Sequence, residues 1–575
     1  MNIFEIFKSD ILKIASNLDN ITTSDKFTIE KPKEESFGDL ATNVAIVSAK
    51  QNERKPIELA NLYAQHIEKL PYVKNIKIDG PGFINIFLKN DILIEILKSI
   101  IDLGTDYGNS NLGKGVKVNV EYVSVNPTGP MHIGHARCAA YGDSLAVVLK
   151  KAGFDVTKEY YINDAGQQIN ILAGSAYLRY LEALGENITI PDGLYPGDYL
   201  IEVGQNLKEQ HGEKLKQLSE NERMAIIKPF AVSEMMKLIR KDLNELGIYH
   251  DIFTSELKIT EAGLIENSIK LLEKSNLLYN GTLEKPKGKT PDDWEEKEQL
   301  IFKSTEFGDD MDRVVKKSDG NNTYFAGDLG YTLDKINRKF DQLIYVLGAD
   351  HVGYIKRLKS IASALSNQEV SCDVKICQLV NFMENGEALK MSKRAGTYIT
   401  VKDVIDLVGS DVIRIMMLTR KNDIGMNFDI AKVKEQSKDN PVFYIQYAHA
   451  RAKSVIRQAK EEHESAFKLY KSNKYDLALL NSEEEQKLIK ILANWPKILE
   501  QAAIHHEPHR VIFYAMEVAS EFHSLWAKGK EKPELKFLLK DNINLTTARL
   551  ALMEALANVV ASTLQVCNVE ALEQM

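Results

Sequence analysis

The sequence predicts a multidomain protein: a doubly wound, Rossmann-type parallel sheet with an insertion, an α/β module before it and an all-α bundle after it. Strand and helix patterns alternate from Val116 onward, as in parallel sheets covered by helices. A second, wholly apolar strand follows at residues 343–347. After about residue 437, apolar and aromatic residues recur at helical spacing. A length of 575 residues accommodates about three or four domains.

The first 112 residues are predicted to form a separate α/β module. An amphipathic helix opens the chain, residues 37–43 precede a second helix, and residues 80–88 form a turn and a strand. The parallel-sheet domain is assigned to residues 113–400, a connecting stem to 401–437 and the helical bundle to 438–575.

The first strand of the sheet has an alternating pattern. Residues 116–122 alternate apolar and polar side chains, which is the period of a strand. The following Asn-Pro-Thr-Gly-Pro at 126–130 cannot continue a strand or sit comfortably inside a helix. A helix is predicted from there to near Gly153. The string His-Ile-Gly-His at 132–135 therefore opens a helix.

Two histidines at a helix start suit phosphate chemistry. The first turn presents unpaired N–H groups and the positive end of the helix dipole. His132 and His135 are three residues apart, so both imidazoles can donate to the same phosphate oxygens. Gly134 leaves space where a flat adenine ring would approach closely. Taken alone, the string is more often just a helix start with two surface histidines.

Further elements continue the alternation. Residues 175–300 are strongly charged and mostly helical in pattern, which predicts an insertion that splits the sheet domain. The apolar strand at 343–347 ends in Gly-Ala-Asp-His, which places Asp350 and His351 just beyond its carboxyl end. Ligands bind at that edge of doubly wound sheets.

A second string supplies cations. Residues 379–383 are predicted to form a strand and 384–387 a tight turn, and Lys-Met-Ser-Lys follows at 390–393. Lys390 and Lys393 in a loop suit a mobile clamp on pyrophosphate, with charge supplied where it develops in the transition state. A lysine-rich loop alone is usually a solvated surface. Paired with the histidine string in this order, it indicates adenylate chemistry.

The chain resembles a class I aminoacyl-tRNA synthetase, and the arginyl-tRNA synthetase family from end to end. The short strings alone indicate only a class I synthetase or a related nucleotidyltransferase. The resemblance rests on blocks that occur in this order: residues 121–137, 160–166, 307–310, 312–313, 318–320, 323–328, 390–396 and 440–451.

The resemblance implies a two-step reaction with ATP and Mg²⁺. Arginine's carboxylate attacks the α-phosphorus of Mg-ATP, and arginyl-adenylate then passes to the terminal adenosine of tRNA(Arg). His132 and His135 would stabilise the phosphates, while Lys390 and Lys393 would clamp the departing pyrophosphate. Other ATP-binding residues implied are Pro130, Gly134, Met391 and Ser392. The family implies that activation requires tRNA, and no editing domain is expected because paired hydrogen bonds to a guanidinium reject other amino acids.

Substrate choice requires an acid. Arginine is always cationic, and its planar guanidinium matches a carboxylate with two hydrogen bonds. The family uses residues matching Tyr324 and Asp328 to hold this group. Glu121 is a second carboxylate by resemblance, for the guanidinium or for the α-ammonium. Asn126 would contact the amino acid's backbone end, as would His351 or its neighbour Asp350.

Bulk properties set the expected surroundings. The resemblance implies that the N-terminal module touches the corner of the tRNA and that the bundle binds its anticodon. The net charge of −8 argues neither for nor against tRNA binding, because a large enzyme can bind RNA through local basic faces. No apolar run reaches membrane-spanning length, so a cytoplasmic protein without membrane association is expected, as a monomer. The four cysteines are expected to be free thiols. No structural zinc is expected, since Pro508 interrupts the histidine-rich segment 505–509.

Three competing interpretations stay open. Another class I synthetase would bring metal-ligating cysteines if specific for cysteine, or a far larger insertion if specific for valine or isoleucine. A non-catalytic tRNA-binding relative would keep the bundle and lose the chemistry, against which His132, His135 and Lys393 argue. A metabolic nucleotidyltransferase would need neither the N-terminal module nor the bundle.

Overall fold

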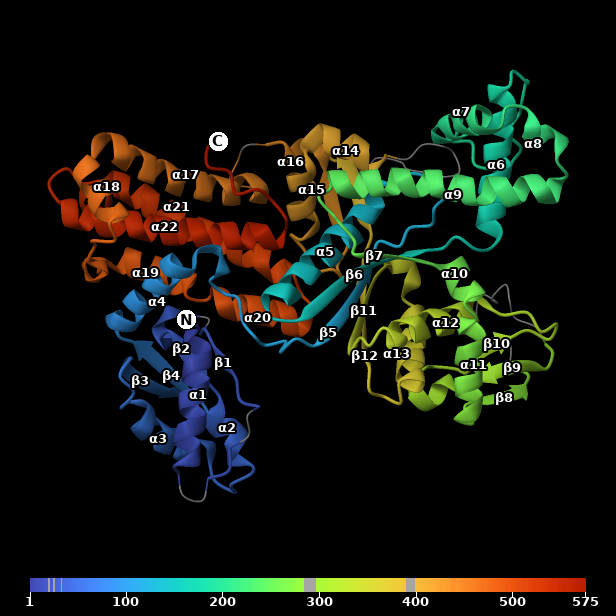
Figure 1. Ribbon diagram of the computed structural model, residues 1–575. Coiled ribbons are helices and arrows are strands. Elements are labelled where there is room, and N and C mark those ends of the chain that lie inside the picture. Colours follow the sequence, from blue (N-terminus) through green and yellow to red (C-terminus); the bar gives the residue numbers. More distant parts are fainter. Residues whose placement is uncertain are drawn as a thin grey trace. The chain divides into compact units, whose positions relative to one another are not determined.

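A computed structural model describes residues 1–18, 21–23, 26–32, 34–283, 296–388, 399–435, 437 and 439–575. The chain divides into two compact units (Figure 1): Met1–Ser110 with Ser437–Met575, and Asn111–Gln436. The first unit is therefore discontinuous in sequence. Across the described ranges, each helix is too short or too polar to span a bilayer.

The centre of the second unit is a five-stranded parallel sheet. Its strand order is β12-β11-β5-β6-β7. The strands are β5 (Lys117–Tyr122), β6 (Asp155–Ile162), β7 (Ile252–Ser255), β11 (Gln342–Gly348) and β12 (Ser371–Cys377). The chain leaves β5 toward β6 and later returns on its other side as β11, so the order reverses between β5 and β11. This confirms the predicted doubly wound sheet and places its ligand-binding crevice beyond the carboxyl ends of these two strands.

Helix α5 (Ala136–Lys151) covers the sheet beside β5. Val118 and Val120 of β5 are buried, and so are Asn119 and Glu121, because both faces of this central strand are covered. Gly142 permits the close packing, because a Cβ there would lie 2.4 Å from the Cβ of Tyr122. The predicted strand and the helix that follows it are both confirmed.

The predicted insertion at 175–300 is interrupted. Helices α6 (Gln167–Ala183), α7 (Tyr199–His211), α8 (Lys214–Gln217) and α9 (Glu220–Glu245) share a core of their own. Figure 1 shows α9 as a long helix between that cluster and the sheet. Residues 252–255 then return to the sheet as β7, which is too short to stand out from its charged surroundings.

A smaller antiparallel sheet follows β7. Its strands, in the order β10-β9-β8, pack with the helices around them through a core that includes Phe302, Phe325 and Leu329. The elements are α10 (Glu256–Glu261), α11 (Leu264–Lys274), β8 (Leu278–Gly281), β9 (Gln299–Phe302), β10 (Arg313–Lys316), α12 (Tyr324–Asn337) and α13 (Tyr354–Leu365).

The end of the second unit contains the predicted strand and tight turn near residue 384. Strands β13 and β14 form that hairpin, and β15 pairs with β13 in parallel. The stem predicted at 401–437 thus belongs, up to residue 436, to the second unit. The elements are β13 (Val380–Glu384), β14 (Glu387–Ala388), α14 (Val401–Val408), α15 (Ser410–Met417), β15 (Met426–Asp429) and α16 (Ile430–Val433).

The first unit joins the N-terminal module to the C-terminal helices. The module has an antiparallel sheet in the order β1-β2-β4-β3. Its elements are α1 (Ile3–Ser16), β1 (Ile29–Glu30), β2 (Leu40–Thr42), α2 (Val44–Ala49), α3 (Pro56–Ile67), β3 (Val73–Asp79), β4 (Phe83–Leu88) and α4 (Asn90–Leu103). The bundle consists of α17 (Pro441–Glu462), α18 (Glu464–Lys471), α19 (Glu483–Leu492), α20 (Trp495–His505), α21 (His509–Glu531) and α22 (Ile543–Val566).

These two parts form one packed body. Helix α4 packs on α22, and the fully buried Trp495 donates its indole N–H to Ser562 at 3.1 Å. The Ser562 hydroxyl in turn donates to the carbonyl of Thr105 at 2.9 Å. Gly108 is required at this junction, because a Cβ there would lie 2.6 Å from the Trp495 ring.

Candidate active site

A strained turn ends β5 at the carboxyl edge of the sheet. Val123 and Ser124 have φ values of 71° and 41°, a region that non-glycine residues rarely adopt and that is least favourable for a β-branched side chain. Three contacts hold this turn: the Ser124 hydroxyl donates to Glu121 (3.2 Å) and accepts from the backbone N–H of Tyr161 (3.0 Å), and the Tyr160 hydroxyl donates to the carbonyl of Val125 (2.6 Å). Backbone strain held in this way is typical of functional sites.

Glu121 is buried at the end of β5 and already has a cationic partner. The ammonium of Lys335, which is completely buried, lies 2.6 Å from its carboxylate. The same ammonium lies 4.3 Å and 4.1 Å from the ring centroids of Tyr331 and Tyr345. A carboxylate and two aromatic faces therefore compensate the burial of this lysine.

One face of α12 connects Glu121 with the solvent. Tyr324, Asp328, Tyr331 and Lys335 are spaced by four, three and four residues, so they follow one another along the helix. Tyr324 begins the helix and is 74% exposed, whereas Asp328 is partly exposed and Lys335 is buried. Tyr324 and Asp328, the two residues that the resemblance assigns to the guanidinium, thus share one helical face.

Carboxylates gather around Asp328. Within the described residues its carboxylate makes no hydrogen bond, and burial together with the charges of Glu256 and Glu121 raises its pKa to about 7, against a smaller opposing effect of Arg357. Burial and Asp164 also raise the pKa of Glu256. The phenol of Tyr161 lies in the field of these four acids, which together with burial raise its pKa. A cation placed among these carboxylates would therefore stabilise their ionised forms.

Asn126 and His351 follow the carboxyl ends of two neighbouring strands, β5 and β11. Asn126, four residues beyond β5, donates through its side-chain amide to Gln168 at 2.9 Å. His351 ends the short turn after β11, is exposed, and meets the ring of Tyr354 edge-on at 5.3 Å. Asp350 beside it is also exposed. Since β5 and β11 are adjacent in the sheet, these residues border the same crevice.

The histidine string begins with one turn of 3₁₀ helix before α5. The imidazoles of His132 and His135 are stacked, with centroids 3.6 Å apart. The backbone N–H of His132 donates to Nδ1 of His135 at 3.3 Å, so the neutral ring of His135 carries its proton on Nε2. The helix start and the common face of both histidines are confirmed.

Gly134 has a local reason to be glycine. A Cβ there would lie 2.8 Å from Nδ1 of His132, so that imidazole itself occupies the space above Gly134. The loop before the histidine string is held by α7: the hydroxyl of Tyr199, the first residue of that helix, donates to the carbonyl of Thr128 at 2.7 Å. Pro130 lies partly exposed between this contact and the histidines.

Backbone hydrogen bonds join the start of the histidine string to residues 399–401, which follow the second string in the sequence. The N–H of Ile133 donates to Ile399 (3.1 Å), and that of Val401 donates to Met131 (2.9 Å). Asp242 of α9 accepts from the N–H of Met131 at 2.9 Å. Residues 390–393 (Lys390, Met391, Ser392 and Lys393) lie outside the described residues. The segment that follows them nevertheless pairs directly with the histidine string.

Sequence patterns did not place Lys335, Glu256 and Tyr161 in the site. A signal for Lys335 was present, because the period of Tyr324 and Asp328 continues to it along α12. Glu256 had no such signal, since its position depends on how α10 packs against α12. Tyr161 lies in the block 160–166, which carries part of the resemblance, but nothing in that block's pattern points to a role for this side chain.

Comparisons with known proteins agree along the whole chain. Three family models match: "Arginyl tRNA synthetase N terminal domain" at residues 3–88, "tRNA synthetases class I (R), catalytic domain" at 97–456 and "DALR anticodon binding domain" at 445–575. Arginine–tRNA ligases of Rickettsia bellii and Rickettsia prowazekii are each 50% identical to the chain, over 100% of both sequences. The Thermus thermophilus arginyl-tRNA synthetase structure, 18% identical, covers 100% of both chains with a TM-score of 0.76 and shows the same fold. The chain therefore belongs to the arginyl-tRNA synthetase family of class I aminoacyl-tRNA synthetases.

Proposed function

We propose that this protein is an arginine–tRNA ligase whose amino-acid pocket is the carboxylate cluster between β5 and α12. The observation that carries the assignment is the clustering of Asp328, Glu256 and Glu121 around the phenol of Tyr161, beside the face of α12 that begins at the exposed Tyr324. A guanidinium placed there would supply the missing positive charge with two parallel hydrogen bonds. Tyr324, on the same face, would close over the exposed side of the guanidinium.

Glu121 suits the other end of the amino acid. Its carboxylate is partly neutralised by Lys335, so Asp328 and Glu256 offer the stronger field for a guanidinium. Glu121, Asn126 and His351 would hold the α-ammonium and carboxylate at the crevice. Arginine is thereby oriented with its carboxylate toward the histidine string.

ATP would occupy the α5 end of the crevice as Mg-ATP. His132 and His135 would donate to its phosphates beside the helix start. Pro130 and Gly134 would border the nucleotide, and Met391 and Ser392 would do so from the other string. Lys390 and Lys393 would neutralise pyrophosphate as it leaves. Attack by the arginine carboxylate on the α-phosphorus then depends on positioning and charge stabilisation.

A partly exposed row of side chains on the bundle suits unstacked tRNA bases. The rings of Phe443 and Tyr447 stack at 5.3 Å on α17. The Arg451 guanidinium lies 4.1 Å from the centroid of Tyr447 and 4.6 Å from that of Trp526 on α21. Aromatic faces and guanidinium planes are the surfaces on which single-stranded bases stack. This row supports anticodon binding by the bundle and, through the shared unit, a tRNA-contacting role for the N-terminal module.

The direct test is exchange of pyrophosphate into ATP. Arginine should support exchange, and only when tRNA is added, while the other amino acids should not. Exchange with lysine would contradict the specificity. A protein that binds tRNA but neither exchanges pyrophosphate nor charges tRNA would instead be a non-catalytic relative. The cytoplasmic location, the monomeric state and the domain boundaries stay part of this proposal.

Arginine use should depend on pH in a defined direction. Asp328 has to be ionised to pair with a guanidinium, and its pKa is raised to about 7. Below that pH the carboxyl is protonated, so kcat/KM for arginine should fall about tenfold per pH unit, and it should level off above about pH 8. Initial rates of tRNA charging at limiting arginine give this profile. A midpoint near the ordinary aspartate pKa would contradict the proposed role.

Gly134→Ala should impair the ATP end alone. The added Cβ would displace the His132 ring, which lies 2.8 Å away. A misplacement of about 1 Å in a catalytic group costs about 100-fold, so kcat/KM for ATP should fall on that order. The matched control is Gly353→Ala, where a Cβ would meet nothing within 4 Å. Equal losses in both variants would show that the effect is not specific to the histidines.

A further inference from the structure

The end of helix α9 contacts both segments that meet directly before the two histidines. The carboxylate of Asp242 accepts from the N–H of Met131 at 2.9 Å, and the carbonyl of Met131 accepts from the N–H of Val401 at 2.9 Å. Glu245, three residues after Asp242 and therefore on the same face of α9, lies 3.6 Å from the ammonium of Lys402. Helix α9 thus holds the residue before the histidine string and the first turn of α14 together.

The position of Met131 determines where the histidines begin. The side chains of Met131 and Ile133 are completely buried. His132, between them, has extended backbone angles and pairs with Thr400 in an antiparallel bridge. Because Met131 and His132 share a peptide bond, a displacement of Met131 moves the imidazole with it. The hydrogen bond from Asp242 therefore bears on the histidine string directly.

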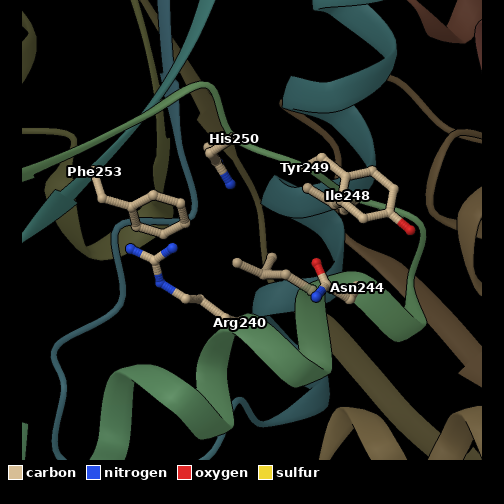
Figure 2. A pocket seen from close by; sticks show the side chains of 7 residues that line it. Arg240, Asn244, Ile248, Tyr249, His250 and Phe253 are labelled. Carbon is tan, nitrogen blue, oxygen red and sulfur yellow. The ribbon is translucent and has the colours of Figure 1, made fainter. Parts of the chain in front are cut away.

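The end of α9 is firmly supported. The carbonyl of Leu246, which caps the helix, accepts from the buried Arg414 at 2.9 Å, and the same guanidinium donates to Asp143 of α5 at 2.5 Å. On the other face of the helix, the guanidinium of Arg240 lies 3.6 Å from the ring centroid of Phe253 in β7, beside the pocket shown in Figure 2. This part of α9 is a support attached to α5 and to the sheet.

Asp242 is a costly residue for the fold. It is buried, and burial raises its pKa to about 6; the charges of Glu245 and Asp403 add to this effect, whereas the hydrogen bond from Met131 lowers the pKa. The folded protein therefore disfavours the ionised carboxylate. An ionised acceptor nevertheless makes a stronger hydrogen bond to a backbone N–H than a neutral one does. A residue kept at a cost in stability beside a ligand site is typical of function.

We propose that Asp242 is a positioning residue for the ATP end of the site, which holds the backbone of Met131 and thereby sets the histidines against residues 399–401. In this role it acts through the chain and not on substrate atoms. The inference rests on the proposed function in one respect, because the histidines have to bind the ATP phosphates. The competing interpretation is that Asp242 only stabilises the fold.

Two variants at Asp242 separate the hydrogen bond from the charge. Asp242→Asn keeps an acceptor oxygen and removes the charge, and Asp242→Leu removes both at a similar size. The matched control is Asp341→Leu, because Asp341 accepts from the N–H of Lys117 at 2.8 Å at the opposite end of β5. Pyrophosphate exchange with tRNA present gives kcat and KM for ATP and for arginine, and melting temperatures report whether the variants are folded.

Asp242→Leu is expected to lower kcat/KM for ATP about 100-fold, the cost of a misplacement of about 1 Å. Asp242→Asn should recover most of this loss, because it retains the acceptor. KM for arginine should not change, and Asp341→Leu should behave like the wild type. Equal losses in the Asn and Leu variants would overturn the proposal, because the charge and not the hydrogen bond to Met131 would then be responsible.

A double-mutant cycle with His132→Ala tests whether Asp242 acts through the histidine. If it does, Asp242→Leu should cost about tenfold less in the His132→Ala background than in the wild type, because the group that it positions is gone. Additive losses in kcat/KM, together with a lower melting temperature, would assign Asp242 to the fold and overturn the proposal.

Failure of the proposed function gives a different result. A wild-type protein that exchanges no pyrophosphate with arginine and tRNA would reject the ligase function. Calorimetric titration with Mg-ATP then still tests the role of Asp242. Loss of ATP affinity in Asp242→Leu but not in Asp242→Asn supports the positioning role, and equal affinities of the wild type and Asp242→Leu overturn it.

Discussion

Asp328→Asn is expected to lower kcat/KM for arginine by about 30- to 5,000-fold, the effect of removing one partner of a buried charge pair. The amide keeps the shape of the side chain but cannot pair ionically with a guanidinium. Burial and the neighbouring acids disfavour the ionised carboxylate in the folded protein, so the same change should leave the protein equally stable or more stable at about pH 8. Charging kinetics and urea denaturation measure the two effects.

The opposite directions of these effects identify a binding residue. A residue that serves the fold loses stability and activity together, whereas a residue that serves a ligand often costs stability. Asp334→Asn is the matched control on α12, since Asp334 pairs with Arg338 away from Glu121. ATP binding should survive in both variants. A large loss of stability in Asp328→Asn would assign Asp328 to the fold instead.

Lys335→Met is expected to lower the free energy of unfolding by about 3–5 kcal/mol, because it leaves Glu121 buried without its cation. The ammonium also lies over the rings of Tyr331 and Tyr345, whose contacts it would lose. Methionine retains most of the apolar length of the side chain, so the effect reports the charge. Urea denaturation at neutral pH measures it.

The double variant Glu121→Gln with Lys335→Met distinguishes the effect of the ion pair from the effect of Lys335 packing. If the cost of Lys335→Met arises from the unpaired carboxylate, neutralising Glu121 should restore a large part of the lost stability. Additive losses would show that Lys335 acts through its packing alone. In either case the double variant should use arginine poorly, because Glu121 is proposed to bind the substrate.

Local patterns were sufficient for the parts of the site that lie at the ends of long elements. β5 and α5 follow from an alternating strand, a proline-rich break and an apolar helix, so the sequence alone places the histidine string at a helix start. Tyr324 and Asp328 could be placed on a common side because their spacing serves both strand and helix. Family resemblance then assigned the chemistry that spacing alone could not.

Features that depend on distant contacts could not be predicted. β7 has four residues and becomes a strand only by pairing with β6, so the helical pattern around it concealed the return to the sheet. The burial of Lys335 follows from Glu121, more than two hundred residues earlier in the chain. The local pattern predicts that adenine uses the space above Gly134, whereas in the structure His132 itself occupies it. In each case the partner, and not the local sequence, determines the outcome.

The discontinuous first unit has a consequence for synthesis on the ribosome. The N-terminal module emerges first, yet the bundle against which α4 packs is separated from it by more than 300 residues. At about 5–20 residues per second, the ribosome needs about 15–65 s to translate the intervening segment. During that interval α4 has no α22 to cover it, and Gly108 has no Trp495. The N-terminal module therefore cannot complete its packing until α22, the last helix of the chain, has been synthesised.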